Sequence, residues 1–399
     1  MAQPERLGDH VEVVTGFPFR SDEYAESGTR LLRGDNIGQG KLRWAGAKRW
    51  PNDRVAESAR FALSAGDVVL AMDRPWIEAG LKYAAVTERD LPCLLVQRVA
   101  RLRAKGDLVQ PFLRYLIGGR SFTDYVLGVQ TGTGIPHISV GQIRDYRFTW
   151  VPVDEQRGIA EVLGALDEKI ALNERIRSTA LGLASACYES AGKSSQSEAV
   201  GDLAALFDGP HATPRKTSEG PCFLSISSLK SGYLDLAESA HLSEDDFPRW
   251  TRRVQPQAGD VLFSYETRLG DAALMPAGIR ASLGRRMALL RSKSGAVSGA
   301  LLLHAYLAPA FQEEIKRRTI HGATVDRLPL KEMPGWRINL PAVGERERLS
   351  AKLDALHSTV MQTAAESRTL ADLRDTLLPQ LVTGQIRVKD ATRVVEEAV

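Results

Sequence analysis

Two stretches of the chain place apolar residues at helical spacing. Each holds four such residues, separated by four, three and four positions. The residues that we assign to helix pairing on this basis are Ile159, Leu163, Leu166, Ile170, Leu349, Leu353, Leu356 and Val360. Residues at this spacing share one face of a helix, which packs on a partner. The pattern therefore predicts long amphipathic helices over roughly 155–190 and 345–381, the first with Asp154 as its N-cap.

The two apolar sets are related by a shift of 190 residues, and other segments recur at a similar shift. Leu7-Gly8-Asp9 returns as Val200-Gly201-Asp202, and residues 65–70 return as residues 258–263. The pair Val151-Pro152 returns as Leu340-Pro341. The chain is therefore an internal tandem repeat, and each copy ends in one of the predicted helices.

The segments that precede the helices read as mixed α/β structure. Alternating or short apolar runs predict strands at Val68–Met72, Leu94–Leu102 and Val261–Tyr265. Pro111–Ile117 and Ala300–Tyr306 are expected to be short helices. The predicted fold class is α+β, with two mixed α/β domains in tandem, separated by two long helices. The expected parts are residues 1–151, a central helix and linker at 152–197, residues 198–340 and a C-terminal helix at 341–399.

Composition narrows the classes of protein that remain. Hydrophobic residues make up 43% and charged residues 25% of the 399 residues, as in globular proteins. No apolar run is long enough for a membrane span, and the N-terminus lacks the pattern of a secretory signal. The three cysteines are far apart and form no metal-ligand pattern, so we expect no metal site and a cytoplasmic location.

Charge follows the repeat. Residues 1–150 carry 21 Lys and Arg against 17 Asp and Glu, whereas residues 151–199 carry 5 against 8. Residues 200–340 carry 18 against 15, and residues 341–399 carry 8 against 9. Two basic segments are thus each followed by an acidic helix, and basic domains of this kind are suited to phosphate contacts.

Motifs of catalysis are missing from the sequence. Gly192-Lys193-Ser194 resembles the end of a phosphate-binding loop, but Cys187 stands where that loop needs its first glycine. The dinucleotide, zinc-protease and nucleophile-elbow motifs do not occur, and there is no Pro-Pro pair for an adenine methyltransferase motif. We expect no catalytic residue in this chain.

The chain resembles the DNA-specificity subunits of type I restriction–modification systems. The segments that carry the resemblance are Val14–Ser21, Leu31–Ile37, Ala65–Val69, Val151–Ala160 and Leu373–Ile386. The second copy departs from the pattern, with Phe207–Pro214 and Phe223–Leu229 in place of the first two segments.

The resemblance implies a pseudo-twofold subunit with two target-recognition domains on an antiparallel coiled coil. Each domain would read a short half-site of double-stranded DNA in the major groove. The subunit would itself need no cofactor. It would assemble with two modification subunits, which would bind S-adenosylmethionine and methylate adenine, and with restriction subunits for cleavage.

Candidate DNA contacts are polar side chains on the predicted loops of both basic segments. They are Arg20, Ser21, Arg33, Asn36, Arg74, Thr133, His137, Arg215, Lys216, Ser227, Arg268 and Thr324. His137 and His321 are expected to occupy comparable places before the two helices. Phe17 and Phe19 are expected in the core rather than against bases.

Two other functions remain open at this level. The chain could be a specificity subunit of a different phage-defence methylation system, or a coiled-coil scaffold without affinity for DNA. A scaffold would bind no duplex even at low salt, whereas binding through phosphates weakens steeply as salt rises.

Overall fold

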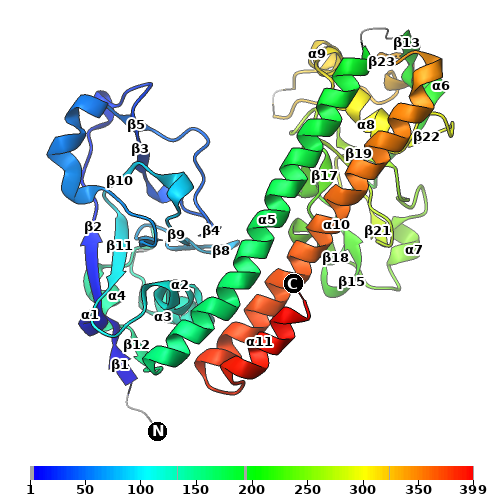
Figure 1. Cartoon of the computed structure of the whole chain (residues 1–399). Helices are drawn as coiled ribbons and strands as arrows, with labels where there is room; N and C mark the ends of the chain where they lie inside the picture. The colour runs from blue at the N-terminus through cyan, green and yellow to red at the C-terminus, as the bar shows by residue number, and fades with distance from the viewer. Residues whose placement is uncertain (1–3, 133, 193–195, 323, 399) are drawn as a thin grey trace. The chain divides into compact units, whose positions relative to one another are not determined.

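Two long helices carry the repeat: α5 (Val153–Ala191) and α10 (Val343–Val382) (Figure 1). In the computed structural model, which describes residues 4–132, 134–192, 196–322 and 324–398, the chain divides into two units. The first unit is Met1–Glu168 with Leu370–Val399, and the second unit is Lys169–Thr369. The division falls inside both long helices, so each helix contributes to both units.

The first unit is built on a five-stranded sheet. Its strands, in order across the sheet, are β2 (Val11–Thr15), β11 (Val99–Ala104), β6 (Val68–Ala71), β9 (Tyr83–Ala85) and β4 (Gln39–Gly40). A second sheet contains β10 (Cys93–Leu95), β3 (Thr29–Leu32) and β5 (Arg49–Trp50), while β1 (Pro4–Arg6) pairs with β12 (Arg147–Thr149). The helices are α1 (Leu7–His10), α2 (Gln110–Gly118), α3 (Arg120–Val129) and α4 (Val140–Asp145). Every residue of β6 is buried, as its unbroken apolar run predicts.

One strand prediction in this unit is wrong. Leu94–Leu102 was expected to be continuous, but β10 and β11 lie in different sheets. The chain turns between them at Arg98, which has a φ of +66°. The sequence does not predict this turn, because glycine and asparagine are the residues that usually adopt a positive φ.

The second unit repeats the arrangement with a four-stranded sheet. Its strands, in order, are β14 (Ala204–Asp208), β22 (Met287–Ser292), β19 (Val261–Ser264) and β20 (Ala272–Leu274). Further strands are β18 (Ala240–His241), β15 (Thr217–Phe223), β21 (Ala281–Ser282), β16 (Leu229–Lys230) and β17 (Tyr233–Leu234). The helices are α6 (Val200–Leu203), α7 (Phe247–Trp250), α8 (Gly299–Leu307) and α9 (Pro309–Arg318). The expected linker also contains a strand, since β13 (Gln196–Ala199) pairs with β23 (Arg337–Leu340).

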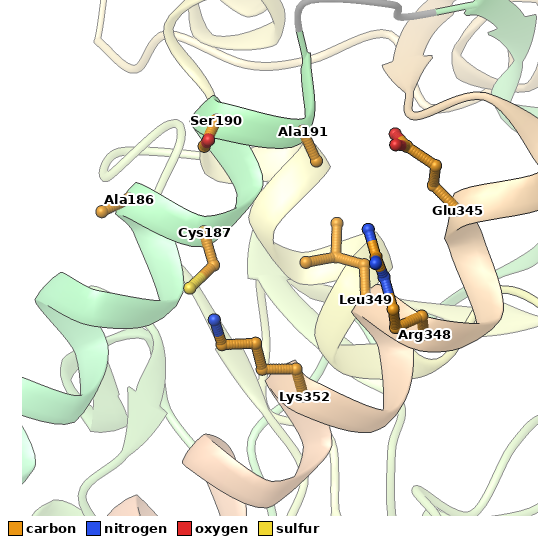
Figure 2. A pocket seen from close by; sticks show the side chains of 8 residues that line it. All are labelled: Ala186, Cys187, Ser190, Ala191, Glu345, Arg348, Leu349 and Lys352. Carbon is orange, nitrogen blue, oxygen red and sulfur yellow. The ribbon is translucent and has the colours of Figure 1, made fainter.

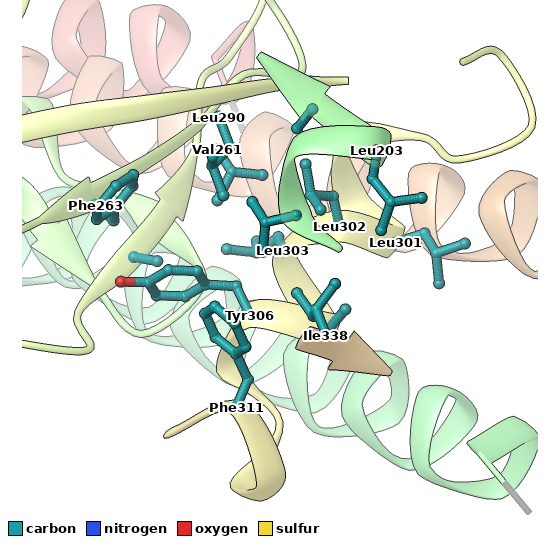
Figure 3. Packing of buried hydrophobic residues seen from close by; sticks show 14 of the residues in the cluster. Leu203, Val261, Phe263, Leu290, Leu301, Leu302, Leu303, Tyr306, Phe311 and Ile338 are labelled. Atoms are coloured by element: carbon teal, nitrogen blue, oxygen red, sulfur yellow. The ribbon is translucent and has the colours of Figure 1, made fainter. Parts of the chain in front are cut away.

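Helix α8 lies at the centre of the second unit (Figure 3). Residues 300–306 are all buried, because the helix is apolar around its whole circumference. Its leucines and Tyr306 pack against Val261 and Phe263 of β19, against Phe311 of α9 and against Ile338 of β23. This core fixes the sheet whose loops form the candidate interface.

Within each unit the two long helices run in opposite directions. In the second unit, Glu366 of α10 accepts a hydrogen bond from Asn173 at 2.8 Å and pairs with Lys169 at 3.3 Å. Farther along, Leu349 and Leu353 share a core with Ala184 and Tyr188. Residue numbers rise along α5 as they fall along α10, so the helices are antiparallel. The predicted fold class, two mixed α/β domains with a pair of long helices, is confirmed.

The C-terminal segment is not a single helix. Helix α10 ends at Val382, and Gly384, with a φ of +71°, reverses the chain into α11 (Val388–Glu396). Helix α11 packs on α5 in the first unit, where a Cβ atom at Gly158 would lie 2.6 Å from Val388. Asp154, expected as the N-cap of α5, lies instead in its first turn. Among the described residues, no helix is long and apolar enough to cross a membrane.

Each unit also ties a short helix to a long one. In the first unit, Asp167 of α5 accepts a hydrogen bond from Tyr115 of α2 at 2.8 Å and pairs with Arg114 at 2.7 Å. In the second unit, the Nε2 atoms of His304 on α8 and His357 on α10 lie 2.9 Å apart. We call these contacts the first and the second helix junction.

Candidate nucleic-acid interface

Three loops of the first unit meet at the end of β6. Met72 donates a backbone hydrogen bond to the carbonyl of Arg98 at 2.9 Å, and its own carbonyl accepts one from Ile138 at 2.9 Å. Arg74 donates to the carbonyl of Pro136 at 2.7 Å. Three segments that lie far apart in the sequence, near residues 73, 98 and 137, are thereby locked together. We call this meeting point the first loop junction.

The side chains of this junction are charged. The carboxylate of Asp73 lies 2.6 Å from Nδ1 of His137 and 3.7 Å from Nε of Arg98. Arg74 and Arg98 both have a positive φ, of 46° and 66°. Few non-glycine residues adopt this conformation, and those that do are often found at functional sites.

A lysine extends the positive charge toward the predicted loop at Arg33. Burial lowers the pKa of Lys82, Asp35 raises it, and the positive charges of Arg74 and Arg43 lower it further. The lysine ammonium approaches the same loop at Gly34, where a Cβ atom would lie 3.9 Å from Nζ. Two of the loops chosen from the sequence are therefore neighbours in the structure.

The second unit contains the same junction. Tyr265 donates to the carbonyl of Arg286 at 3.1 Å and accepts from Leu328 at 2.9 Å, and Thr267 donates to the carbonyl of Asp326 at 3.2 Å. These three hydrogen bonds match those of the first loop junction, with shifts of 188 to 193 residues. We call it the second loop junction.

Its side chains keep the acid and one arginine but change their neighbours. Glu266 forms an ion pair with Nε of Arg286 at 3.1 Å, as Asp73 does with Nε of Arg98. Thr267 and Arg286 have φ values of 70° and 72°, and Nη1 of Arg286 donates to the Thr267 hydroxyl at 3.2 Å. Arg327 exchanges two backbone hydrogen bonds with Ile320, as His137 does with Thr131. The counterpart of His137 is therefore Arg327, and the expected equivalence with His321 is wrong.

Comparison with known proteins relates part of this chain to a family. Residues 5–180 match the family model of the type I restriction modification DNA specificity domain. The match covers less than half of the chain. The specificity-domain match includes the first loop junction and most of α5.

Two relatives match stretches of similar length. The EcoAI specificity subunit of Escherichia coli, a type I restriction enzyme component, is 35% identical over 166 residues, which are 41% of this chain and 28% of that protein. The MjaVIII specificity subunit of Methanocaldococcus jannaschii is 29% identical over 171 residues, 43% of this chain and 40% of that protein. The match thus covers less than half the length of each relative.

One solved structure extends the likeness to both units. The S subunit of a type I restriction–modification system from M. genitalium superposes with a TM-score of 0.56 at 14% identity. The superposition covers 95% of each chain. At this identity it shows a shared fold, including the second unit, which the specificity-domain model does not reach.

The predicted DNA contacts of the specificity domain are only partly brought together. Arg33, Arg74 and His137 lie at or beside the first loop junction. Arg20 is exposed and pairs with Asp22, and Ser21 follows it in a short helical turn. Thr133 lies outside the described residues.

Asn36 has a structural position that its sequence does not reveal. It is only 7% exposed. Its side-chain carbonyl accepts from the backbone of Arg33 at 3.0 Å, and its amide donates to the carbonyl of Arg43 at 3.0 Å. Both ends of the amide are thus used inside the loop, contrary to the expectation of an exposed base contact.

In the second unit, Arg268 and Ser227 come from neighbouring loops. Arg268 donates to the carbonyl of Ile226 at 3.2 Å and pairs with Asp271, while the Ser227 hydroxyl bonds that of Ser225. Exposed positions are occupied by Arg215, Lys216 and Thr324.

The predicted helix-pairing residues face the interior with two partial exceptions. Residues Ile159, Leu163, Leu166, Leu349, Leu353 and Val360 are buried, and Ile170 and Leu356 are half-buried. Leu349 and Leu353 contact the core around α8 as well as α5. Phe19 packs edge-on against Trp50 in the core, in the place expected for it.

A pocket of about 570 Å³ lies between the ends of α5 and α10 in the second unit (Figure 2). Lys352 points across it toward Cys187, and Arg348 and Glu345 lie on the same side as the lysine. It contains none of the predicted DNA contacts. Among the residues that the structure describes, no group of three or more His, Cys, Asp or Glu is placed to hold a metal ion.

The sequence did not point to Lys82, Arg98, Arg286 or Arg327. Arg98 lies inside Leu94–Leu102, which the sequence predicts as one strand, so nothing marks it as a loop residue. Lys82, Arg286 and Arg327 lie outside the segments chosen from the sequence, and only three-dimensional contacts bring them to the loop junctions.

Proposed function

We propose that the chain is the sequence-recognition subunit of a type I restriction–modification complex. The proposal rests above all on the duplicated loop junction, which presents cationic side chains at equivalent places in two basic domains. The match of residues 5–180 to the DNA specificity domain supports it. Each unit would bind one half of a bipartite target in double-stranded DNA.

The contacts that we assign to DNA follow from this geometry. Exposed arginine and lysine side chains would hold phosphates, and polar groups at the loop junctions would reach base edges in the major groove. The segment that contains α5 carries more acidic than basic residues and would stay off the duplex. The proposal includes a cytoplasmic location, where chromosomal DNA is found.

Catalysis is assigned to the partners. Two modification subunits would bind S-adenosylmethionine and methylate adenine in each half-site, and restriction subunits would cleave unmodified DNA. This chain would hold no cofactor and carry out no chemical step. Both curated relatives are described as specificity subunits, which supports this division.

Modification mapping tests the proposal directly. The chain is co-expressed with its neighbouring methyltransferase gene in a methylation-free bacterial host, and the host DNA is sequenced for modified adenines. We expect a split motif, two short half-sites around an unspecified gap, that disappears when this chain is omitted. An unchanged modification pattern without the chain would contradict the proposal and favour a scaffold.

Duplex binding at two salt concentrations separates the scaffold from the recognition subunit. Phosphate contacts make affinity fall steeply between low and moderate salt. Absence of duplex binding by the assembled complex at low salt would support the scaffold. A split motif made with a partner set lacking any restriction gene would instead point to another phage-defence methylation system.

A further inference from the structure

Four non-glycine residues with a left-handed backbone mark the loop junctions. Within the described chain they are Arg74, Arg98, Thr267 and Arg286. They form two equivalent pairs, one in each unit. Such a conformation persists at a non-glycine residue when the surroundings hold it, and it often accompanies function. Because glycine would fit the same backbone more easily, the side chains are the feature that needs an explanation.

The side chain of Arg98 contributes little to the fold. Its side chain is 61% exposed, and an ion pair joins Nε to Asp73 at 3.7 Å. An exposed pair at this distance adds almost nothing to stability. The loop is held by the hydrogen bond from the backbone of Met72 to the carbonyl of Arg98. The backbone carbonyl of any other residue at this position could accept the same bond.

Another pair of arginines in the same units shows what a structural arginine looks like here. Arg103 and Arg291 each bind one buried carboxylate through both Nε and Nη2, that of Asp67 or Asp260. Their donor forks are therefore occupied. Arg98 and Arg286 instead approach their acid most closely through Nε, at 3.7 Å and 3.1 Å, without the two-bond arrangement of Arg103 and Arg291.

A free pair of guanidinium donors matches one base edge better than any other. Guanine offers O6 and N7 as two adjacent acceptors in the major groove, and arginine binds them with two parallel hydrogen bonds. In Arg286, Nη1 donates to Thr267 at 3.2 Å, a bond that base binding would replace or share. The acid at Nε limits how far the guanidinium can rotate.

We propose that Arg98 and Arg286 each read a guanine, one in each half-site of the DNA target. This inference rests on the proposed function and deepens it by naming the residues and the base. The differing neighbours, His137 beside Arg98 and Arg327 beside Arg286, would give the two half-sites different flanking bases.

The test uses the co-expressed complex with Arg98→Ala, Arg98→Gly and Arg98→Lys, and the same three changes at Arg286. We expect each Arg98 variant to lose preference at one G·C position of one half-site, with affinity for that half-site reduced about 10-fold to 100-fold. Lysine keeps the charge but lacks the fork, so it should also relax the position. The other half-site should be unchanged. Arg120→Ala, which removes an exposed arginine on α3, is the matched control and should leave the motif intact.

The glycine variants separate reading from folding. Glycine adopts a positive φ readily, so Arg98→Gly should melt at or above the temperature of the parent chain while its G·C position is lost. Unfolding of both the alanine and the glycine variant would show that the side chain is structural and would overturn the proposal. So would an unchanged motif, loss at both half-sites, or relaxation at an A·T position. Failure of the parent complex to give a split motif would instead refute the proposed function itself.

Discussion

The two helix junctions join equivalent elements with different chemistry. His304 is the sixth residue after the N-cap of α8, as Tyr115 is after the N-cap of α2, and His357 lies 190 residues after Asp167. In the first junction a carboxylate receives a hydroxyl and an arginine, whereas in the second two buried imidazoles face each other. The repeat thus retains the contact between a short and a long helix, while the interaction that forms it has diverged.

The difference predicts that the two junctions respond differently when the pH falls. Burial lowers the pKa of His304 to about 4, and the neighbouring imidazole lowers it as well. Burial also lowers the pKa of His357 to about 4. In the first junction burial raises the pKa of Tyr115, so its hydroxyl stays protonated. The second junction is therefore the one expected to weaken in mild acid.

The largest expected effect comes from removing the acid of the first junction. Asp167→Ala leaves Arg114 and the Tyr115 hydroxyl without this acceptor, and leaves Arg374 with Asp375 as its remaining acidic partner. Loss of one partner from a buried ion pair costs about 3–5 kcal/mol, which urea unfolding would measure. Asp124→Ala, which breaks an exposed pair with Arg120, is the control and should change stability by less than about 0.5 kcal/mol. Similar losses for both variants would mean that Asp167 is not the centre of the junction.

Acid should act on the second junction. An unfolded histidine binds a proton below about pH 6.5, but these two bind one only near pH 4 in the folded chain. Between these values the unfolded state holds more protons, so stability falls as pH falls. From pH 7 to pH 5 we expect a loss of about 2–4 kcal/mol, seen as faster hydrogen exchange in α8.

The comparison within one chain supplies the control for this experiment. Exchange in α2 should change little over the same pH range, and the double variant His304→Gln/His357→Gln should flatten the response of α8. An equal acceleration in both helices would show that acid acts on the chain as a whole and not through the imidazole pair.

The smallest effect tests how much the charge of Asp167 matters. Tyr115→Phe removes one hydrogen bond to a carboxylate and should cost about 1.5–3 kcal/mol. Tyr188→Phe, in the second unit, removes a bond to the neutral carbonyl of Asn339 and should cost about 1 kcal/mol. Denaturant midpoints of the two variants give the comparison. A larger loss for Tyr188 would remove the reason to treat the first junction as charge-assisted.

Much of the architecture could be predicted because it depends on periodic patterns. The apolar spacing predicted helices at 155–190 and 345–381, close to α5 and α10, since burying one face of a helix imposes that spacing. The strand at Val68 and the helix at Ala300 follow from dense apolar runs. The break at Arg98 could not be predicted, because tertiary hydrogen bonds hold its backbone there.

The candidate interface was harder to predict than the fold. Three loops chosen from the sequence, at Arg33, Arg74 and His137, lie close together in the structure, because polar turns next to buried strands are visible in the sequence. Which side chain of a loop is free is decided by three-dimensional contacts, as the buried amide of Asn36 and the exposed guanidinium of Arg98 show. Similarity between the two copies misled at His321, which directly follows Ile320, the counterpart of Thr131, and lies six residues before Arg327, the counterpart of His137.

The left-handed arginines also bear on protein engineering. Replacing a strained non-glycine residue by glycine relieves roughly 1 kcal/mol or more of backbone strain. A procedure that optimises thermal stability alone would therefore select glycine at Arg98 and Arg286. On the proposed role of these arginines, the resulting chain would be more stable but would no longer discriminate two bases of its DNA target. Selection for stability and selection for base discrimination would therefore favour different residues at these two positions.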